Sequence, residues 1–291
     1  NADVYYKLLE QVENFSQESV DLEHAVAKIM KEQEIDGFML NEQKATMLAA
    51  KLNSKMAEIE KKVHETFKPK WVDDKLVTPK LRKDGTISKV GLTNEEMRKC
   101  LRSNNLEPFM RQKWVTFNLA SRKQIGEYLI DFGWKPTKFT PTGQPIVDET
   151  TLEKVKDIPE ATLIAEFMML QKRVAQVSSW LELSKDGRVH WFVIPNGAIT
   201  GRMTHRSPNV AQTPSSNKPY GKECRECWTV PEGYKLVGID ASGLELRVLA
   251  HYMKNEEYIN EIVNGDIHTT NQNLAGLGSR SQAKTFIYAL I

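Results

Sequence analysis

The sequence predicts an α+β fold built mainly from long helices, with short strands between them. Apolar residues recur at helical spacing over three stretches, 18–34, 42–66 and 159–183. The pair Asp84-Gly85 lies between two short strand-like runs, which is typical of a hairpin turn. Residues 236–239 form a short apolar run of strand character, and helical spacing resumes after it. With 291 residues, the chain is too long for one small domain.

The charge and hydropathy of the chain exclude several classes of protein. Hydrophobic residues make up 40% of the chain, which is enough for a core, and 40 basic against 38 acidic residues give a net charge of only +2. Any nucleic-acid surface must therefore come from local clusters of basic residues. No stretch approaches the roughly 20 apolar residues of a membrane span, and the first residues lack a signal-peptide pattern. We expect a cytoplasmic protein that does not contact a membrane.

The chain has three cysteines, of which Cys224 and Cys227 form a C-x-x-C pair and Cys100 lies far away. A structural zinc site requires four ligands, and the sequence has no second pair at matched spacing. We therefore expect free thiols in a reducing compartment.

Each of the three helical stretches has an apolar face of the kind that packs in a core. Asn41 is a suitable N-cap for the second helix. The faces consist of Val20, Leu22, Ala25, Ile29 and Met30 in the first helix, Met47, Leu48, Leu52, Met56, Ile59 and Val63 in the second, and Ile164, Met168, Leu170, Val174, Val177 and Leu181 in the third.

The segment 67–117 differs in character from the helices around it. Residues 67–89 contain seven lysines and arginines against three aspartates, a local charge of +4 (seven minus three). This segment is either a solvated loop or an arm that contacts DNA phosphates or a partner protein. After it, Ser121 and Gln124 form a capping-box pattern at a helix start. Such a start presents N–H groups that suit a phosphate, and Arg122 adds positive charge there.

Two patterns near the end of the chain favour phosphate and metal chemistry. Asp240 follows the apolar run 236–239 and precedes a helix, a junction where a carboxylate can hold Mg²⁺ or serve only the structure. Arg280, Lys284 and Tyr288 recur every four residues and so share one helix face. Two cations at this spacing repel each other mildly. This face either binds a polyanion such as a triphosphate or is simply solvated.

Several segments together resemble family A (polymerase I-like) DNA polymerases, in the variant used by phage replicative enzymes. IDASGLELRVLAHYM is similar to motif A of that family, and GDIHTTNQ with RSQAKTFIY is similar to the segment that leads into motif B and to most of that motif. NGAITGRMTHRSPNVAQTP resembles the TGR…PN-x-Q-x-P stretch of the palm. FNLASRKQI and FMMLQKRVAQ resemble thumb segments. The segments occur in the family's order and at its spacing, through nearly the whole chain.

The resemblance implies DNA-templated DNA polymerisation, that is, nucleotidyl transfer from a dNTP to a primer 3′-OH by two Mg²⁺ ions in phage replication. It implies that Asp240 is the first metal-binding and catalytic aspartate and that Ala241 lends a backbone carbonyl to the same ion. It implies a set of nucleotide-binding residues, with Glu245 excluding a ribose 2′-hydroxyl and Tyr288 at the sugar: Glu245, His268, Arg280, Lys284 and Tyr288. It also implies contacts to primer–template DNA, with Arg202 and Gln212 in the minor groove, from Arg202, Gln212, Ser121, Arg122, Lys172 and Arg173.

The same resemblance predicts a right-hand architecture with parts missing. We expect a helical thumb over 1–185 with an insert at about 67–117, a partial antiparallel palm sheet over 186–251, and the start of the fingers over 252–291. No His-Asp-Glu sequence of motif C occurs, and the chain stops inside motif B. We therefore expect an incomplete two-metal site in a partial gene product, an engineered fragment, or one half of a split polymerase whose partner chain supplies the rest. Trp191 stands where the family often has a small residue.

Other functions and partners remain open at this point. The alternative to an enzyme is a non-catalytic fragment that binds primer–template duplex. A single-subunit RNA polymerase is a third possibility, against which the bulk of Glu245 argues. The insert falls where some phage polymerases bind host thioredoxin as a processivity factor, and the same partner is a hypothesis for this chain.

Overall fold

The computed structural model describes residues 2–103 and 106–290, which form two compact units. The first unit extends to Tyr234 and the second begins at Lys235. Helices and small antiparallel sheets coexist in the first unit, so the predicted α+β class is confirmed. The division at 234/235 falls inside the expected palm segment 186–251, and the thumb, palm and fingers boundaries stay predictions.

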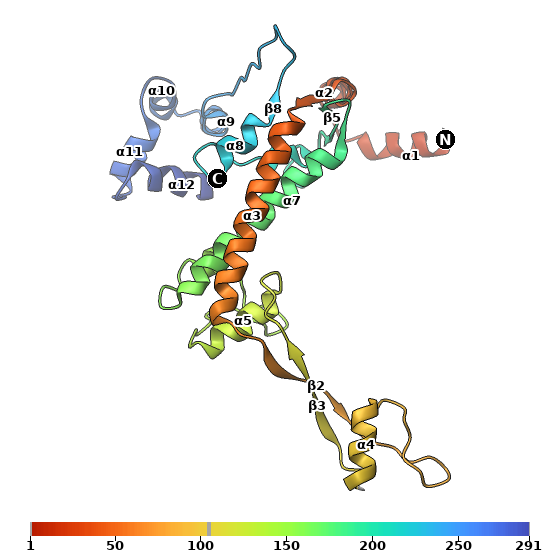
Figure 1. Ribbon diagram of the computed structural model, residues 1–291. Coiled ribbons are helices and arrows are strands. Elements are labelled where there is room, and N and C mark those ends of the chain that lie inside the picture. Colours follow the sequence, from red (N-terminus) through yellow and green to blue (C-terminus); the bar gives the residue numbers. More distant parts are fainter. Residues whose placement is uncertain (1, 104–105, 291) are drawn as a thin grey trace. The chain divides into compact units, whose positions relative to one another are not determined.

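The first unit contains most of the secondary structure, and Figure 1 shows the course of its elements. Its helices are α1 (Ala2–Val12), α2 (Gln17–Asp36), α3 (Glu42–Thr66), α4 (Asn94–Ser103), α5 (Arg122–Asp131), α6 (Glu149–Leu152), α7 (Pro159–Leu183) and α8 (Gly221–Glu226), with the 3-10 turn η1 (Val210–Gln212). Its strands are β1 (Phe38–Leu40), β2 (Lys70–Val77), β3 (Phe109–Val115), β4 (Ser184–Lys185), β5 (Arg188–Val189), β6 (Phe192–Ile194), β7 (Thr204–Arg206) and β8 (Trp228–Thr229). In the described ranges no helix is long and apolar enough to cross a membrane.

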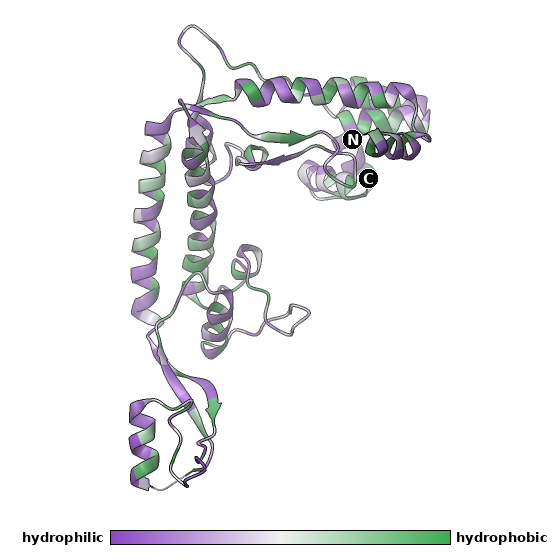
Figure 2. Ribbon diagram, turned by 90° about the vertical axis from the view of Figure 1, so that its right-hand side faces the viewer, coloured by the Kyte–Doolittle hydropathy of each residue, from purple (hydrophilic) through white to green (hydrophobic). Residues whose placement is uncertain are grey.

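The core of the first unit lies between α3 and α7, which run side by side in Figures 1 and 2. Both helices have the predicted bounds, and the Asn41 side chain accepts a hydrogen bond from the backbone N–H of Lys44 at 2.9 Å, as predicted. The predicted apolar faces supply much of the core: Leu48, Leu52, Ile59, Val63, Ile164, Met168, Leu170 and Val177. Met47 is the exception, since it is 65% exposed.

A four-stranded sheet, in the order β4-β5-β1-β8, lies where α3 begins and α7 ends. Tryptophan side chains pack at this sheet. Trp180 of α7 packs edge-on against Trp228, and Trp191 stacks on Phe38 with ring centroids 4.7 Å apart. Trp191 is also 5.8 Å from Trp228 and almost fully buried. The large residue at position 191 is therefore part of the core of this sheet.

The predicted helix over 18–34 forms as α2, but the expected burial of its apolar face is wrong. No α2 residue is buried among the described residues, and Leu22 and Ile29 are each more than half exposed. Helical spacing determines that a helix forms, whereas burial requires a facing surface. The main neighbour of α2 in the described chain is the short strand β6, which is too small to cover a 20-residue helix.

The segment 67–117 forms a two-stranded antiparallel ribbon of β2 and β3, with α4 in the connection between them. The predicted turn at Asp84-Gly85 forms within that connection. Gly85 has φ +80°, and a single antiparallel bridge joins Leu81 to Ile87. Only glycine takes such a φ without strain, so Asp84-Gly85 closes this small hairpin. The longer strands on either side were not predicted.

Glu96 joins α4 to the ribbon. Its carboxylate accepts hydrogen bonds from Nε of Arg111 at 2.6 Å and from the Thr93 N–H at 2.7 Å, and Thr93 Oγ1 accepts from the Glu96 N–H. This is a reciprocal capping box combined with an ion pair. The Arg111 guanidinium, followed by the Thr93 hydrogen bonds, lowers the pKa of Glu96 to about 2.

We predict that Glu96→Gln destabilises α4 and the connection around it by on the order of 2 kcal/mol at pH 7. Because the folded-state pKa is depressed, the contribution of Glu96 is complete above about pH 4.5 and is lost as the pH falls toward about 2. Hydrogen exchange of α4 should therefore differ between wild type and variant at pH 7 and converge in acid. Glu95→Gln, one residue away and exposed, is the matched control. Equal exchange in wild type and Glu96→Gln at pH 7 would contradict the prediction.

The described part of the second unit, residues 235–290, contains four helices, and the predicted strand at 236–239 does not form. The helices are α9 (Leu244–Met253), α10 (Glu256–Asn264), α11 (Ile267–Leu274) and α12 (Arg280–Leu290). Leu236, Val237 and Ile239 are 63%, 77% and 95% exposed. A strand requires a neighbour for its backbone N–H and C=O groups, and the described chain pairs none with this segment. The prediction of a strand over 236–239 is therefore wrong.

All three cysteines are free, as the sequence predicted, and the structure shows that all three are also buried. Burial raises the pKa of the Cys227 thiol to about 11 and also raises that of Cys224. Both are therefore protonated at neutral pH, which makes them poor nucleophiles and poor metal ligands.

Candidate functional site

A polar pocket of about 410 Å³ lies within the second unit. Five of the predicted metal- and nucleotide-binding residues line it: Asp240, His268, Arg280, Lys284 and Tyr288. They come from the segment before α9, from the first turn of α11 and from α12. The fold therefore brings together residues that are up to 48 positions apart in the sequence (288 minus 240).

On α12 the basic residues that line the pocket lie next to the buried residues, so the pocket borders the small core of the second unit. Ala283 and Ile287 are buried, and Ile287 packs with Leu246 and Ile267 in the small core of the second unit. Ser279 accepts a hydrogen bond from the Gln282 N–H and so starts the helix. Tyr288 packs partly against the same core, and its ring centroid lies 6.0 Å from that of His268.

Asp240 reaches the pocket through a tight turn before α9. Gly243 has φ +61° at the start of that helix, a backbone conformation that favours glycine. Asp240 and Ala241 are both exposed, and Asp240 lines the pocket, whereas Ala241 is not among the lining residues. Glu245 lies in the first turn of α9 and is exposed, but it is not among the residues that line the pocket.

The charges in the pocket favour a neutral His268 beside the positively charged Arg280 and Lys284. Burial lowers the pKa of His268, and the positive charges of Arg280 and Lys284 lower it further. Hydrogen bonds from Arg280 and from Thr269 hold the pKa of Asp266 well below its usual range. The imidazole is therefore neutral near pH 7, while the carboxylate and the guanidinium are fully charged.

The pocket contains some, but not all, of the oxygen ligands that a Mg²⁺ ion requires. Mg²⁺ binds one or two carboxylates and takes its other ligands from water and substrate phosphates. Asp240 is the carboxylate of this pocket that is available for such an ion. Asp266 also lines the pocket, but both of its oxygens accept hydrogen bonds from Arg280. Within residues 2–103 and 106–290, no three His, Cys, Asp or Glu side chains gather as a complete metal cage.

Two charged residues of the pocket were not predicted from the sequence, Asp266 and Arg247. The signal for Asp266 was available, since an aspartate that precedes a helix and has a threonine three residues later is a typical N-cap. Asp266 accepts from the His268 N–H and from Thr269 Oγ1, and it caps α11. Arg247 has no such signal. Its Nε donates to the Ser242 carbonyl and so supports the turn after Asp240.

Four of the predicted DNA-contacting residues lie around α6 in the first unit. The Ser121 side chain caps α5 by accepting from the Gln124 N–H at 3.4 Å, so the predicted helix start is confirmed. Gln124 reaches back to the Asn118 N–H instead of completing the capping box. Arg122 is near Asp148, the N-cap of α6, and Lys172 of α7 forms a 2.7 Å ion pair with Glu149 of α6. Arg173 follows on α7 and is half-buried.

The other two predicted DNA contacts, Arg202 and Gln212, are both exposed. Arg202 lies in the connection between β6 and β7, and its carbonyl accepts from the Ala198 N–H at 3.0 Å. Gln212 ends the short turn η1, which follows β7 and contacts it. Both residues are therefore accessible to a ligand on this part of the first unit.

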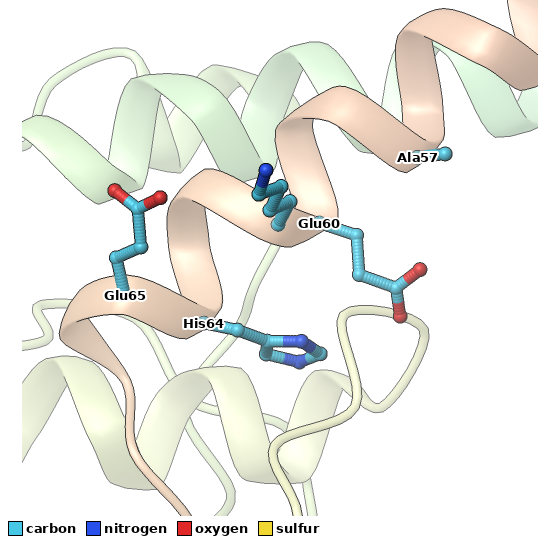
Figure 3. A pocket seen from close by; sticks show the side chains of 5 residues that line it. Ala57, Glu60, His64 and Glu65 are labelled. Atoms are coloured by element: carbon cyan, nitrogen blue, oxygen red, sulfur yellow. The ribbon is translucent and has the colours of Figure 1, made fainter.

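A second, open depression of about 480 Å³ runs along α3, and none of the predicted site residues line it. Figure 3 shows that the Glu60, His64 and Glu65 side chains diverge there. His64 Nε2 lies 2.8 Å from the Phe117 carbonyl and joins α3 to the segment before α5. A structural role accounts for His64, and the divergent side chains form no binding constellation.

Comparisons with known proteins agree with one family. The model of DNA polymerase family A matches residues 87–291. The DNA-directed DNA polymerases of Escherichia phage T7 and Enterobacteria phage T3 are 37% and 38% identical to this chain over 95% of its length. The POL domain of Pol1 from M. smegmatis, solved with DNA primer-template and dNTP, has a TM-score of 0.64 and 19% identity, over 90% of this chain and 40% of that one. The chain covers 46% of each phage relative, about half their length.

Proposed function

Since this chain belongs to DNA polymerase family A, we propose that it carries part of the active site for DNA-templated DNA synthesis in phage replication. The observation that carries this proposal is the pocket that gathers Asp240, His268, Arg280, Lys284 and Tyr288. A pocket that combines the Asp240 carboxylate with the cations Arg280 and Lys284 and a neutral imidazole suits a magnesium-bound triphosphate better than it suits a neutral ligand.

Each residue of the pocket has a role that follows from its chemistry. Bound magnesium supplies charge neutralisation and Lewis acidity for phosphoryl transfer, with two ions in the complete site. Asp240 and the Ala241 carbonyl would hold one of these ions. Arg280 and Lys284 neutralise the charge that builds on the leaving pyrophosphate. His268 donates one N–H to a phosphate oxygen as a neutral imidazole, and the Tyr288 ring packs against the sugar.

Glu245 is proposed to select deoxyribose by occupying the space of a 2′-hydroxyl. Its place in the first turn of α9, five residues after Asp240, supports this role, because the sugar lies next to the reacting phosphate. Arg202 and Gln212 are proposed to contact the minor groove of the primer–template end. Minor-groove acceptors are nearly alike for all base pairs, so such contacts test pair shape without reading sequence. Ser121, Arg122, Lys172 and Arg173 are proposed to contact backbone phosphates.

Primer extension tests the proposed function. The chain alone should extend poorly, because one carboxylate does not hold two ions. The chain mixed with a family C-terminal segment that carries the His-Asp-Glu motif should extend a primer with magnesium and dNTPs. Duplex binding without extension in either mixture would leave a non-catalytic fragment that binds primer–template DNA. Efficient use of ribonucleotides would instead favour an RNA polymerase.

A missing C-terminal polymerase segment is also proposed as a binding partner. Leu236, Val237 and Ile239 are strand-forming by composition and largely exposed, and their backbone groups need a neighbouring strand. The chain covers 46% of each phage relative, and the proposed neighbour is a segment from outside that matched part.

For the β2–β3 ribbon, host thioredoxin is proposed as a processivity partner. Trp71 pairs with Trp114 across the ribbon, and Leu76 pairs with Met110. These four side chains are between 48% and 62% exposed. An exposed apolar ribbon face with paired tryptophans is typical of a protein-binding surface.

We predict that thioredoxin increases the length of product that the completed enzyme makes per binding event, and that Trp71→Ala with Trp114→Ala removes this effect. Exposed aromatic anchors dominate the energy of such interfaces, so a loss of about tenfold or more in thioredoxin affinity is expected. The readout is processivity with an unlabelled DNA trap. Val90→Ala, an exposed apolar residue outside the ribbon strands, is the control. Product length that does not respond to thioredoxin would sink the hypothesis.

A further inference from the structure

The Arg280 guanidinium is already bound by a carboxylate in the pocket of the second unit. Nε of Arg280 donates to Oδ2 of Asp266 at 2.7 Å, and Nη2 donates to Oδ1 at 2.9 Å. These two parallel bonds form a bidentate pair, which is the strong geometry for arginine and carboxylate. The pair joins the first residue of α12 to the N-cap of α11.

The bonds to Asp266 use only one edge of the guanidinium. The group has five N–H donors, one on Nε and two on each terminal nitrogen. Asp266 takes one on Nε and one on Nη2, which leaves three, and two of these form the edge between Nη1 and Nη2. That edge has the fork geometry that binds a phosphate through two hydrogen bonds. Asp266 and a phosphate therefore need not compete for the same donors.

Asp266 is itself held in place from two directions. Its Oδ2 also accepts from Thr269 Oγ1 at 2.7 Å, and its Oδ1 accepts from the His268 N–H at 3.3 Å. These hydrogen bonds hold the carboxylate at the first turn of α11, the same turn that contains His268. A long arginine side chain loses much freedom when it is ordered, and a fixed partner removes part of that loss before any ligand arrives.

We propose that Asp266 is a positioning residue, which fixes Arg280 by one edge so that its other edge meets the triphosphate. This inference rests on the proposed function, because it assigns the ligand of Arg280 to a nucleotide. The negative charge of Asp266 opposes the triphosphate, but its side chain is 46% exposed, and water weakens that repulsion. The proposal therefore requires that the gain from orienting Arg280 exceeds this weakened repulsion, which the binding experiment tests.

The experiment is binding of dATP with magnesium to the 291-residue chain without primer, measured by titration calorimetry. Asp266→Ser keeps an N-cap for α11 and removes the bidentate acceptor. For Asp266→Ser we expect the dissociation constant for dATP to be about tenfold higher than for the wild type. Loss of a residue that orients a ligand-binding side chain usually has an effect of this size. Arg280→Ala should also weaken binding, and Asp266→Ser added to Arg280→Ala should have no further effect. Asp266→Glu, which restores a carboxylate, should recover part of the lost affinity.

The outcomes separate the two proposals. Asn255→Ser exchanges the N-cap of α10, away from Arg280, and should leave the affinity unchanged. An equal loss from Asp266→Ser with and without Arg280 would show a purely structural cap and overturn the inference. Tighter binding by Asp266→Ser would overturn it as well, because Asp266 would then be a competitor of the triphosphate. If Asp266→Ser bound dATP with the wild-type affinity, the inference would be overturned, and the proposed function would stand. No dATP binding by the wild-type chain would overturn the proposed function, and the inference with it.

Discussion

Replacing Asp240 with asparagine should lower primer extension by about 1,000-fold or more, in the chain completed by a C-terminal segment. The amide keeps the shape of the side chain but loses the charge that holds magnesium against a triphosphate. Because the reacting phosphate depends on that ion, the loss should appear in kcat more than in the affinity for DNA. The measurement is single-turnover extension of a labelled primer at saturating dNTP.

Two controls separate a loss of chemistry at Asp240 from a loss of folding. The residue is exposed and outside the described helices and strands, so Asp240→Asn should leave the unfolding transition unchanged. Asp157→Asn, an exposed aspartate of the first unit, should extend primers like the wild type. Full activity of Asp240→Asn would remove this carboxylate from the chemistry and, with it, the main support for the two-metal mechanism.

The largest effect on stability is expected from Trp180→Ala, which should lower the free energy of unfolding of the first unit by about 3–5 kcal/mol. Trp180 is fully buried between α7 and the four-stranded sheet, and its ring packs against Trp228 at 5.0 Å. Truncation leaves a cavity at the end of the helix pair where α7 meets the sheet. Chemical denaturation followed by circular dichroism measures the change.

Two matched variants make this prediction specific. Trp180 Nε1 is buried and has no hydrogen-bond partner among the described residues, so Trp180→Phe removes an unpaired donor and keeps most of the packing. We expect that variant to lose at most about 1.5 kcal/mol. Trp71→Ala removes the same volume from an exposed position and should change stability by about 0.5 kcal/mol or less. Equal losses at positions 180 and 71 would contradict this account of the core.

The sequence by itself determined the elements whose signals are local. Helical spacing and an N-cap at Asn41 were sufficient for the bounds of α3 and α7, because both signals act within one or two turns. The spacing of Arg280, Lys284 and Tyr288 placed them on one face of α12 for the same reason. Their proposed roles came from the resemblance of whole motifs to a family.

Only the tertiary structure decided which of these surfaces are covered and which residues meet. Composition made Leu236, Val237 and Ile239 strand-forming, but a strand needs a partner, and the described chain offers none. The face of α2 is apolar and yet exposed, because a helix pattern does not supply the surface that buries it. The contact between Asp266 and Arg280 joins residues 14 positions apart on two helices. It depends on how α11 and α12 pack, which is a property of the fold and not of local spacing.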